Sequence, residues 1–184
     1  MRTTAPWLAI ATVLVATVVR LRAQGRLWSC ACGYVLVWTG DVWGPGNSQH
    51  FLDPYSLTHL LHGFALAGLL AWAVPRLPPP WQLALAVALE ATWELIENSP
   101  FVIERYRATA ALGYQGDAIL NSLGDIAACG LGVGLARALG VRRTLVVVAV
   151  VELALLVWIR DSLLLNVVML LHPLPAVRAW QLGW

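Results

Sequence analysis

The stretch EATWELIENSPFVIERYRATAALGYQGDAILNSLGD, residues Glu90–Asp125, contains most of the acidic groups of the chain. Two apolar segments within it carry polar groups at helical spacing, and a short charged segment joins them. These groups fall at i, i+4 and i+7 and then at i, i+4 and i+8: Glu90, Glu94 and Glu97, followed by Asp117, Asn121 and Asp125. Each set therefore shares one face of its helix.

The composition surrounding this stretch is that of a membrane protein. Hydrophobic residues make up 59% of the chain and charged residues only 12%, against roughly 25% charged in soluble domains. We therefore expect a single integral membrane domain over residues 1–184. The net charge of +2 is too small to indicate nucleic-acid binding.

Hydrophobic segments and their breaks predict an all-α, polytopic membrane helix bundle. About five transmembrane helices are expected, over residues 6–22, 56–74, 81–98, 116–139 and 144–159. Residues 162–172 are too short to span alone, and they predict a short C-terminal interfacial or re-entrant helix. The first helix is expected to stay uncleaved, because arginines follow it where a signal peptide would have small residues. The long polar segment 23–58 is expected to cap one face.

Tryptophans support a membrane location by their positions near segment ends. Seven of the ten tryptophans lie at or near such ends: Trp28, Trp38, Trp43, Trp72, Trp81, Trp180 and Trp184. An aromatic belt at the membrane–water interface has this distribution.

Chain direction places the polar groups on one side of the bundle. In an antiparallel bundle, the second helix begins, the third ends and the fourth begins at the same side. His59 and His62, the acids of Glu90–Asp125, and Arg160 then converge. Unpaired charges inside a membrane cost several kcal/mol, so these groups must pair, protonate, bind a cation or line a wet cavity. This predicts a functional site with five acid–base or ligand groups: Glu94, Glu97, Asp117, Asn121 and Asp125.

Two interpretations of the cluster remain open. His59 and His62 at i, i+3, with carboxylates from neighbouring helices, suit a divalent metal such as zinc that activates water. Alternatively, the same groups form an interhelical hydrogen-bond network neutralised by arginines. The HExxH signature of zinc proteases is absent from the sequence.

The arginines also allow two interpretations. Arg105, Arg107 and Arg160, with Tyr106, are predicted to bind a substrate, because the arginine fork suits the phosphate of a lipid headgroup. The alternative is internal ion pairing with Glu97, Glu104 and Asp161. Residues 104–107 are expected to form a loop between two helices.

Cysteine positions predict little chemistry. Cys30 and Cys32 are expected to lie too close in sequence for an easy mutual disulfide, and Cys129 to be a buried free thiol. Cys30, Cys32 and His50 form a metal or redox site in one interpretation and only fold the loop in the other.

Several motifs carry a resemblance to a known family. They are C-x-C-G-Y, N-S-Q-H, H-x-x-H-G-F, W-E-x-x-E-N, E-R-Y-R, G-D-x-x-x-N-S-x-G-D and R-D-x-x-x-x-N. From about Cys30 to Trp180, the chain resembles an uncharacterised bacterial inner-membrane family, a UPF-type domain of unknown function. It is more weakly similar to VanZ-like membrane proteins, which are associated with teicoplanin resistance. The VanZ-like positions fall on Glu94, Arg105, Asp117, Asn121 and Gly124, although the glutamine that usually follows the glutamate is missing.

The resemblance implies a multi-pass protein of the bacterial inner membrane and brings no established activity. From the residues, we expect hydrolysis or transfer on a lipid or lipid-linked headgroup. The alternative is a non-catalytic, VanZ-like protein that binds a lipophilic ligand or assists an envelope complex. Membrane lipids are the expected partners. The N-terminus is expected in the cytoplasm and the polar face in the periplasm.

Overall fold

A computed structural model describes residues 4–109, 111 and 113–183. The described residues form seven helices: α1 (Ala5–Ala23), α2 (Ser56–Ala73), α3 (Pro79–Glu97), α4 (Pro100–Arg107), α5 (Ile119–Ile159), α6 (Leu163–Leu171) and α7 (Pro175–Gln181). The predicted all-α class is therefore confirmed. Prolines open α3, α4 and α7, where a missing N–H costs nothing and the fixed φ suits the first turn.

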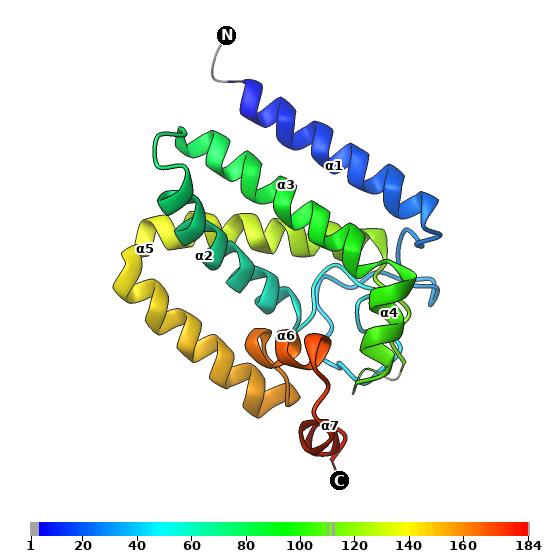
Figure 1. Ribbon diagram of the computed structural model, residues 1–184. Coiled ribbons are helices and arrows are strands. Elements are labelled where there is room, and N and C mark those ends of the chain that lie inside the picture. The colour runs from blue at the N-terminus through cyan, green and yellow to red at the C-terminus, as the bar shows by residue number, and fades with distance from the viewer. Residues whose placement is uncertain (1–3, 110, 112, 184) are drawn as a thin grey trace.

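The long helices form a bundle in which the polar ends of α2, α3 and α5 lie at the same side. α1 lies beside α3, and α2 packs mainly against α5 (Figure 1). The segment between α1 and α2 folds under the bundle, and α4, α6 and α7 lie at the same end (Figure 1). Side chains that end α3, begin α2 and begin α5 therefore meet at one place.

The helix α5 contains a break at Gly140. Two separate helices are predicted, at 116–139 and 144–159, and they adjoin directly across Gly140, whose φ of 72° and ψ of 166° are not helical. A positive φ is easily adopted only by glycine. The two halves of α5 consequently point in different directions (Figure 1).

Two local predictions need correction or extension. Residues 104–107 were expected to be a loop but belong to α4, whose start is capped by the Ser99 side chain accepting from Val102 N–H. Capping by serine and a following proline explain this short helix. The predicted short C-terminal helix is present as α6, and a further helix, α7, follows it.

Small residues set the contact between α2 and α5. A Cβ on Gly63 would collide with the backbone of Cys129, and a Cβ on Gly132 would collide with the backbone of Leu60. The close approach of these helices therefore depends on both glycines. Gly134, by contrast, has open space around it.

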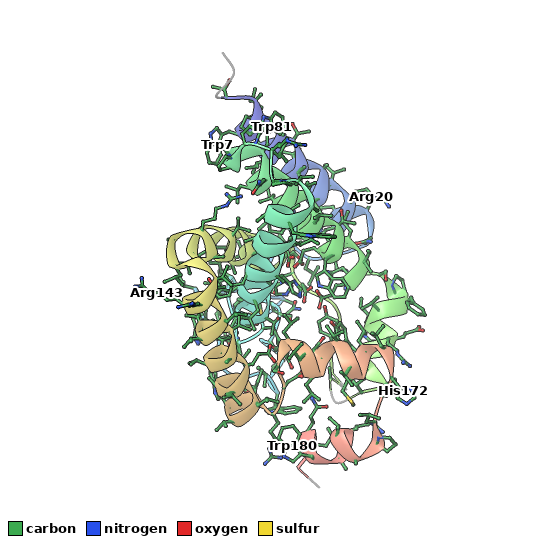
Figure 2. All side chains as sticks on the ribbon, turned by 60° about the vertical axis from the view of Figure 1, so that its left-hand side comes forward. Trp7, Arg20, Trp81, Arg143, His172 and Trp180 are labelled. Carbon is green, nitrogen blue, oxygen red and sulfur yellow. A yellow bond between two sulfur atoms is a disulfide. The ribbon has the colours of Figure 1, made fainter. Side chains whose placement is uncertain are left out.

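Two helices, α1 and α2, are long and apolar enough to cross a membrane by length and composition. This hints at a membrane association, but the predicted five-span bundle is not confirmed, since α3 and α5 carry several acids and arginines. Trp7 and Trp81 lie at one end of the molecule and Trp180 at the other (Figure 2). Trp184 lies outside the described residues.

Candidate functional site

Six side chains from three helices form what we call the acid–histidine cluster. α2 contributes His59 and His62, α3 contributes three glutamates, and α5 contributes one aspartate; the acids are Glu90, Glu94, Glu97 and Asp125. Four of the six side chains are buried, whereas His62 and Glu97 are half-buried. The helical spacing predicted from the sequence thus brings these groups together.

Glu90 is held by both histidines. Its Oε1 lies 2.6 Å from Nδ1 of His59 and 2.9 Å from Nδ1 of His62. Its Oε2 lies 3.1 Å from the same nitrogen of His62. The carboxylate of Glu90 is therefore paired on both oxygens, and it orients the ring of His59.

Glu94, one turn further along α3, differs from Glu90 in its hydrogen bonding. It is 0% exposed, and neither of its carboxylate oxygens accepts a hydrogen bond from a described residue. Nδ1 of His59 lies 3.4 Å from Glu94 Oε1. One oxygen each of Asp125 and Glu97 is likewise buried without a hydrogen-bond partner in the described chain. Buried carboxylate oxygens without donors are costly, so these acids require a further positive or donating group besides His59.

The predicted arginines do not supply that group. Arg105 donates to two carbonyl oxygens at the end of α6, at 2.6 and 2.8 Å. Arg107 donates to the carbonyl oxygen of Tyr114 at 2.6 Å. Arg160 donates to the carbonyl oxygen of Trp180 at 3.1 Å. Across the part of the chain that is described, each carboxylate ion pair is made with His59 or His62, and none with an arginine.

A cavity of about 870 Å³ opens beside the cluster. Its acidic and histidine lining comprises His50, His59, Glu97, Asp117, Asp125 and Asp161. Tyrosines and asparagines add polar groups: Tyr34, Tyr55, Tyr106, Tyr114, Asn47 and Asn166. No arginine is among its described lining residues. Both a ligand and water thus have access to His59 and Asp125, whereas Glu94 lies behind them.

Asp117 lines the same cavity but is fully partnered. Its Oδ2 accepts from Nδ2 of Asn98 at 2.8 Å, and its Oδ1 accepts from the hydroxyl of Tyr114 at 2.9 Å. Its backbone N–H donates to Oδ1 of Asn98 at 2.7 Å. We call this arrangement the Asn98–Asp117 lock.

Asn121 lies away from the cavity lining. Its amide donates to Oδ2 of Asp53 at 3.4 Å. Asp53 is 1% exposed and also accepts from the backbone N–H groups of Ser48 and Tyr55. Asn121 therefore ties α5 to the loop before α2, a structural contact that the sequence did not indicate.

The far wall of the cavity is a second polar network. Oδ2 of Asp161 accepts from the hydroxyl of Tyr55 and from the amide of Asn166, both at 3.3 Å. The hydroxyl of Tyr106 donates to Oδ1 of Asn166 at 3.1 Å. Burial raises the pKa of Asp161 to about 6, against the opposing hydrogen bonds. Tyr106 and Asn166 thus line the cavity together, and the binding of a substrate by Tyr106 stays a prediction.

Two sets within the cluster have ligand atoms close enough for a metal ion. They are His59, His62 and Glu90, and His59, Glu94 and Glu97, each with atoms within 4.8 Å of one another. The first set is already closed by hydrogen bonds. The second contains the unpartnered oxygens, and nitrogen and carboxylate ligands are those that zinc uses in catalytic sites. A ligand in the cavity would approach a cation at this second set past Asp125, which lines the cavity.

Sequence reasoning missed several residues of this site. Asn98 and Asp53 fix the acids on either side, and Tyr114 joins the lock. Asn98 directly follows the last glutamate in W-E-L-I-E-N, and Asp53 precedes a proline just before α2. Their position next to helix ends was the available signal, since polar side chains there often bind backbone groups.

Cys30 and Cys32 are joined by a disulfide, which corrects the expectation that they lie too close to bond. Their Cα atoms are 5.1 Å apart, within the range that a disulfide needs. Cys129 is a buried free thiol, as predicted.

Comparison with known proteins gives one consistent result. The family model of a protein of unknown function (DUF2585) matches residues 21–183. The chain is 45% identical to a UPF0314 protein of Rhizobium meliloti over 184 residues, which cover 99% of this chain and 93% of the relative. It is also 45% identical to a UPF0314 protein of Paracoccus denitrificans over 182 residues, covering 98% and 94%. No solved structure matches the chain.

Proposed function

This chain belongs to the DUF2585 family, whose curated relatives are UPF0314 proteins, and we propose that it is a multi-pass membrane protein that binds a divalent cation and acts on a lipid or lipid-linked headgroup. The predicted resemblance to an uncharacterised UPF-type family is confirmed by these matches. The activity proposed is hydrolysis or transfer at the cavity beside the acid–histidine cluster.

One observation carries the proposal: Glu94 is completely buried, with both oxygens unpartnered, next to His59. Asp125 Oδ1 and Glu97 Oε2 are unpartnered in the same cluster. A group of acids with one shared histidine carries excess negative charge, and no arginine of the described chain is paired with it. A divalent cation would remove this imbalance and satisfy the free oxygens together.

The cation would have a chemical role because the cluster borders a cavity. His59, Glu94 and Glu97 would hold it, and a metal-bound water would become a nucleophile near neutral pH. Asp125 lines the cavity and has one oxygen without a hydrogen-bond partner, so it would accept the proton of that water. Glu90 would keep the ring of His59 in place, as carboxylates behind metal-bound histidines do.

Exposed apolar surface supports insertion into a membrane. The second half of α5 exposes a row of large hydrophobic side chains: Val141, Leu145, Val146, Val150, Leu153 and Val157. α1 exposes Leu8, Val15 and Val19 in the same way. Such continuous apolar faces fit a lipid environment better than water. We place the polar end at the periplasmic side, with the N-terminus in the cytoplasm.

A membrane substrate would reach the site from the polar end. The cavity combines carboxylates with tyrosines and lacks arginine, so a phosphate group would bind through the cation rather than through arginine forks. Arg105, Arg107 and Arg160 instead bind carbonyl oxygens that hold α6, α7 and the loop before α5. They would shape the cavity without contacting the headgroup.

The test is metal content followed by turnover. Full-length protein in detergent is stripped with a chelator, reloaded with zinc or manganese and analysed by mass spectrometry. We expect about one ion per chain, lost in Glu94→Gln and kept in Glu104→Gln, which changes an exposed acid of α4. The loaded protein is then assayed for phosphate release from a polyprenyl diphosphate in mixed micelles.

The two steps have separate contradicting outcomes. Equal metal content in wild type and Glu94→Gln would overturn the cation site. Bound metal with tight retention of the lipid, but no product, would favour the non-catalytic VanZ-like alternative over an enzyme.

A further inference from the structure

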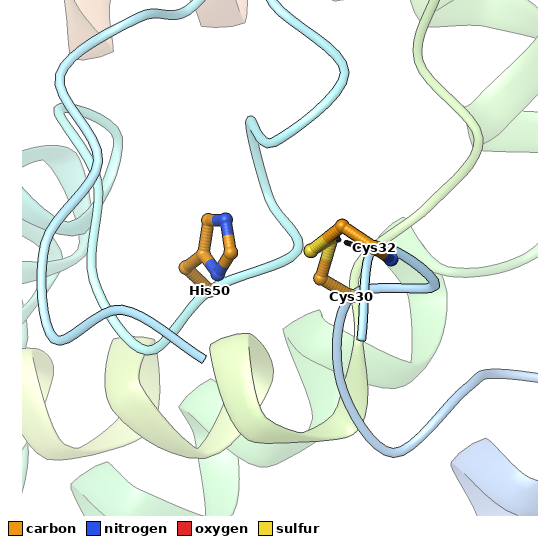
Figure 3. Close-up of side chains that lie close together, drawn as sticks. All are labelled: Cys30, Cys32 and His50. Atoms are coloured by element: carbon orange, nitrogen blue, oxygen red, sulfur yellow. Dashed lines mark hydrogen bonds between the residues drawn. A yellow bond between two sulfur atoms is a disulfide. The ribbon is translucent and has the colours of Figure 1, made fainter. Parts of the chain in front are cut away.

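A second group of reactive side chains lines the same cavity: Cys30, Cys32 and His50. Figure 3 shows the ring of His50 beside the two cysteines. The two sulfur atoms and a ring nitrogen of His50 lie within 4.8 Å of one another. We infer that Cys30 and Cys32 form a redox-active pair that exchanges with an external dithiol, with His50 stabilising the thiolate that is released.

The disulfide is placed where it adds little to folding stability. It links residues only two positions apart. A cross-link stabilises a protein mainly by restricting the unfolded chain, and this effect falls with the length of the closed loop. A disulfide across one intervening residue therefore stabilises the fold very little. This favours a role in thiol–disulfide exchange over a structural one.

The pair is accessible to a thiol reagent from outside. Cys32 is exposed and Cys30 is half-buried, so an attacking thiolate reaches Cys32 more easily. Attack at one sulfur atom makes the other the leaving group, and exchange is faster when that leaving thiolate is stabilised. Cys30 is therefore the expected leaving group.

Groups that suit the reduced state are already in place around both sulfur atoms. The backbone N–H of Cys32 lies 3.1 Å from Sγ of Cys30, where it would donate to a thiolate. Sγ of Cys32 lies 3.4 Å from the carbonyl oxygen of Tyr34, which would accept from a thiol. Both sulfur atoms thus keep a partner after the disulfide opens.

His50 is held in one orientation beside the pair. Its Nδ1 accepts from the backbone N–H of Leu36 at 3.2 Å, and its ring stacks on Tyr34 at 5.4 Å. Because Nδ1 is an acceptor, the proton of the neutral ring resides on Nε2. No hydrogen bond from Nε2 is recorded among the described residues, which leaves this N–H to donate to sulfur.

Reduction of the Cys30–Cys32 disulfide takes two exchange steps. A thiolate of the dithiol attacks Sγ of Cys32, the Cys30–Cys32 bond breaks, and Cys30 leaves as a thiolate stabilised by its own turn and by His50. The second thiol of the reductant loses its proton, which reaches the Cys30 thiolate through water, and then attacks the mixed disulfide. Cys32 leaves and takes up the proton lost by the first thiol. Two electrons pass from the dithiol to the protein, and the dithiol is oxidised to a disulfide.

The test uses full-length protein in detergent, with mixtures of reduced and oxidised dithiothreitol as the probe. Samples are quenched with acid and alkylated with a polyethylene glycol maleimide, so that each free thiol adds mass. We expect a reversible gain of two thiols in the folded protein, which is lost in Cys30→Ser and Cys32→Ser. The matched control Cys129→Ser changes a buried cysteine of α5 and should leave the transition unchanged.

Two variants of His50 separate its chemical role from a structural one. His50→Asn keeps an acceptor for Leu36 but loses the Nε2–H, whereas His50→Gln can place an amide N–H near the Nε2 position. We expect His50→Asn to slow reduction about tenfold and His50→Gln to recover most of the rate. A disulfide that opens only on unfolding, or thiols that never oxidise, would overturn the redox pair. Equal rates in both His50 variants and wild type would overturn the role of His50.

Discussion

The Asn98–Asp117 lock and the unpartnered pair Glu94 and Asp125 are neighbouring sets of buried acids with opposite hydrogen-bonding states. In the lock, both carboxylate oxygens of Asp117 accept from side chains that lie within 3 Å. Both oxygens of Glu94, by contrast, are buried without a donor in the described residues. Buried acids that are saturated hold a structure together, whereas unsaturated ones are poised for a ligand.

The largest effect is expected from breaking the lock. Asn98→Ala removes two hydrogen bonds to Asp117, one of them to a carboxylate oxygen. A hydrogen bond to a charged group contributes about 1.5–3 kcal/mol and one between neutral groups about 1 kcal/mol, so we expect a loss of about 3–4 kcal/mol in the free energy of unfolding. Thermal unfolding followed by tryptophan fluorescence measures it, with Asn47→Ala in the loop as the control. A loss no larger than that of Asn47→Ala would remove the distinction between the two regions.

Asp161 should contribute a pH dependence of stability. Burial raises its pKa from 3.8 to about 6 in the folded protein, so the folded state binds its proton more tightly than the unfolded state. The resulting stabilisation is fully present below pH 3.8 and is lost as the pH rises through about 6. At about 1.4 kcal/mol per pKa unit, this amounts to about 3 kcal/mol.

Asp161→Asn should therefore flatten the stability profile between those pH values. The amide keeps an oxygen for Tyr55, and Asn166 can turn its own amide to suit. Glu152 of α5, which raises the pKa of Asp161, remains in both proteins. Denaturant unfolding at a series of pH values measures the difference, and parallel profiles for the two proteins would contradict the assignment.

Glu94→Gln should have the opposite sign from Asn98→Ala when the protein is stripped of metal. It removes a buried negative charge that has no donor, so we expect unfolding free energy to rise by about 1–2 kcal/mol. Glu104→Gln at an exposed position serves as the control. Destabilisation as large as that of Asn98→Ala would show that Glu94 is a structural acid.

The smallest effect concerns His62. It binds Glu90 rather than the unpartnered acids, so it would support the cation only through Glu90 and His59. We expect His62→Ala to weaken zinc binding about tenfold and His59→Ala to abolish it. Competition with a chelating dye measures both affinities, and equal losses would place His62 among the ligands.

Helix positions followed from the sequence where apolar segments were long. The bounds predicted for α1, α2 and α3 lie within about two residues of those observed, because hydrophobic length and flanking prolines define them. α4 was missed because E-R-Y-R is too polar to indicate a helix, and only the Ser99 cap and Pro100 start reveal it.

The meeting of His59 with Glu94 and Asp125 could also be predicted, since helical spacing and chain direction suffice to bring them together. The sequence could not predict which acid has all its hydrogen-bond partners, because this depends on the orientation of single side chains, such as that of Asn98 toward Asp117. The arginines were misleading for the same reason: their long side chains reach carbonyl oxygens on α6 and α7, whose positions no local pattern specifies.

The most direct test of the account is an experimental structure of zinc-loaded protein with anomalous data collected at the zinc edge. The account predicts a peak bound by His59, Glu94 and Glu97, at metal–ligand distances of about 2.0–2.2 Å. An acid–histidine cluster without a peak, with Glu94 hydrogen-bonded to water or protein, would contradict it.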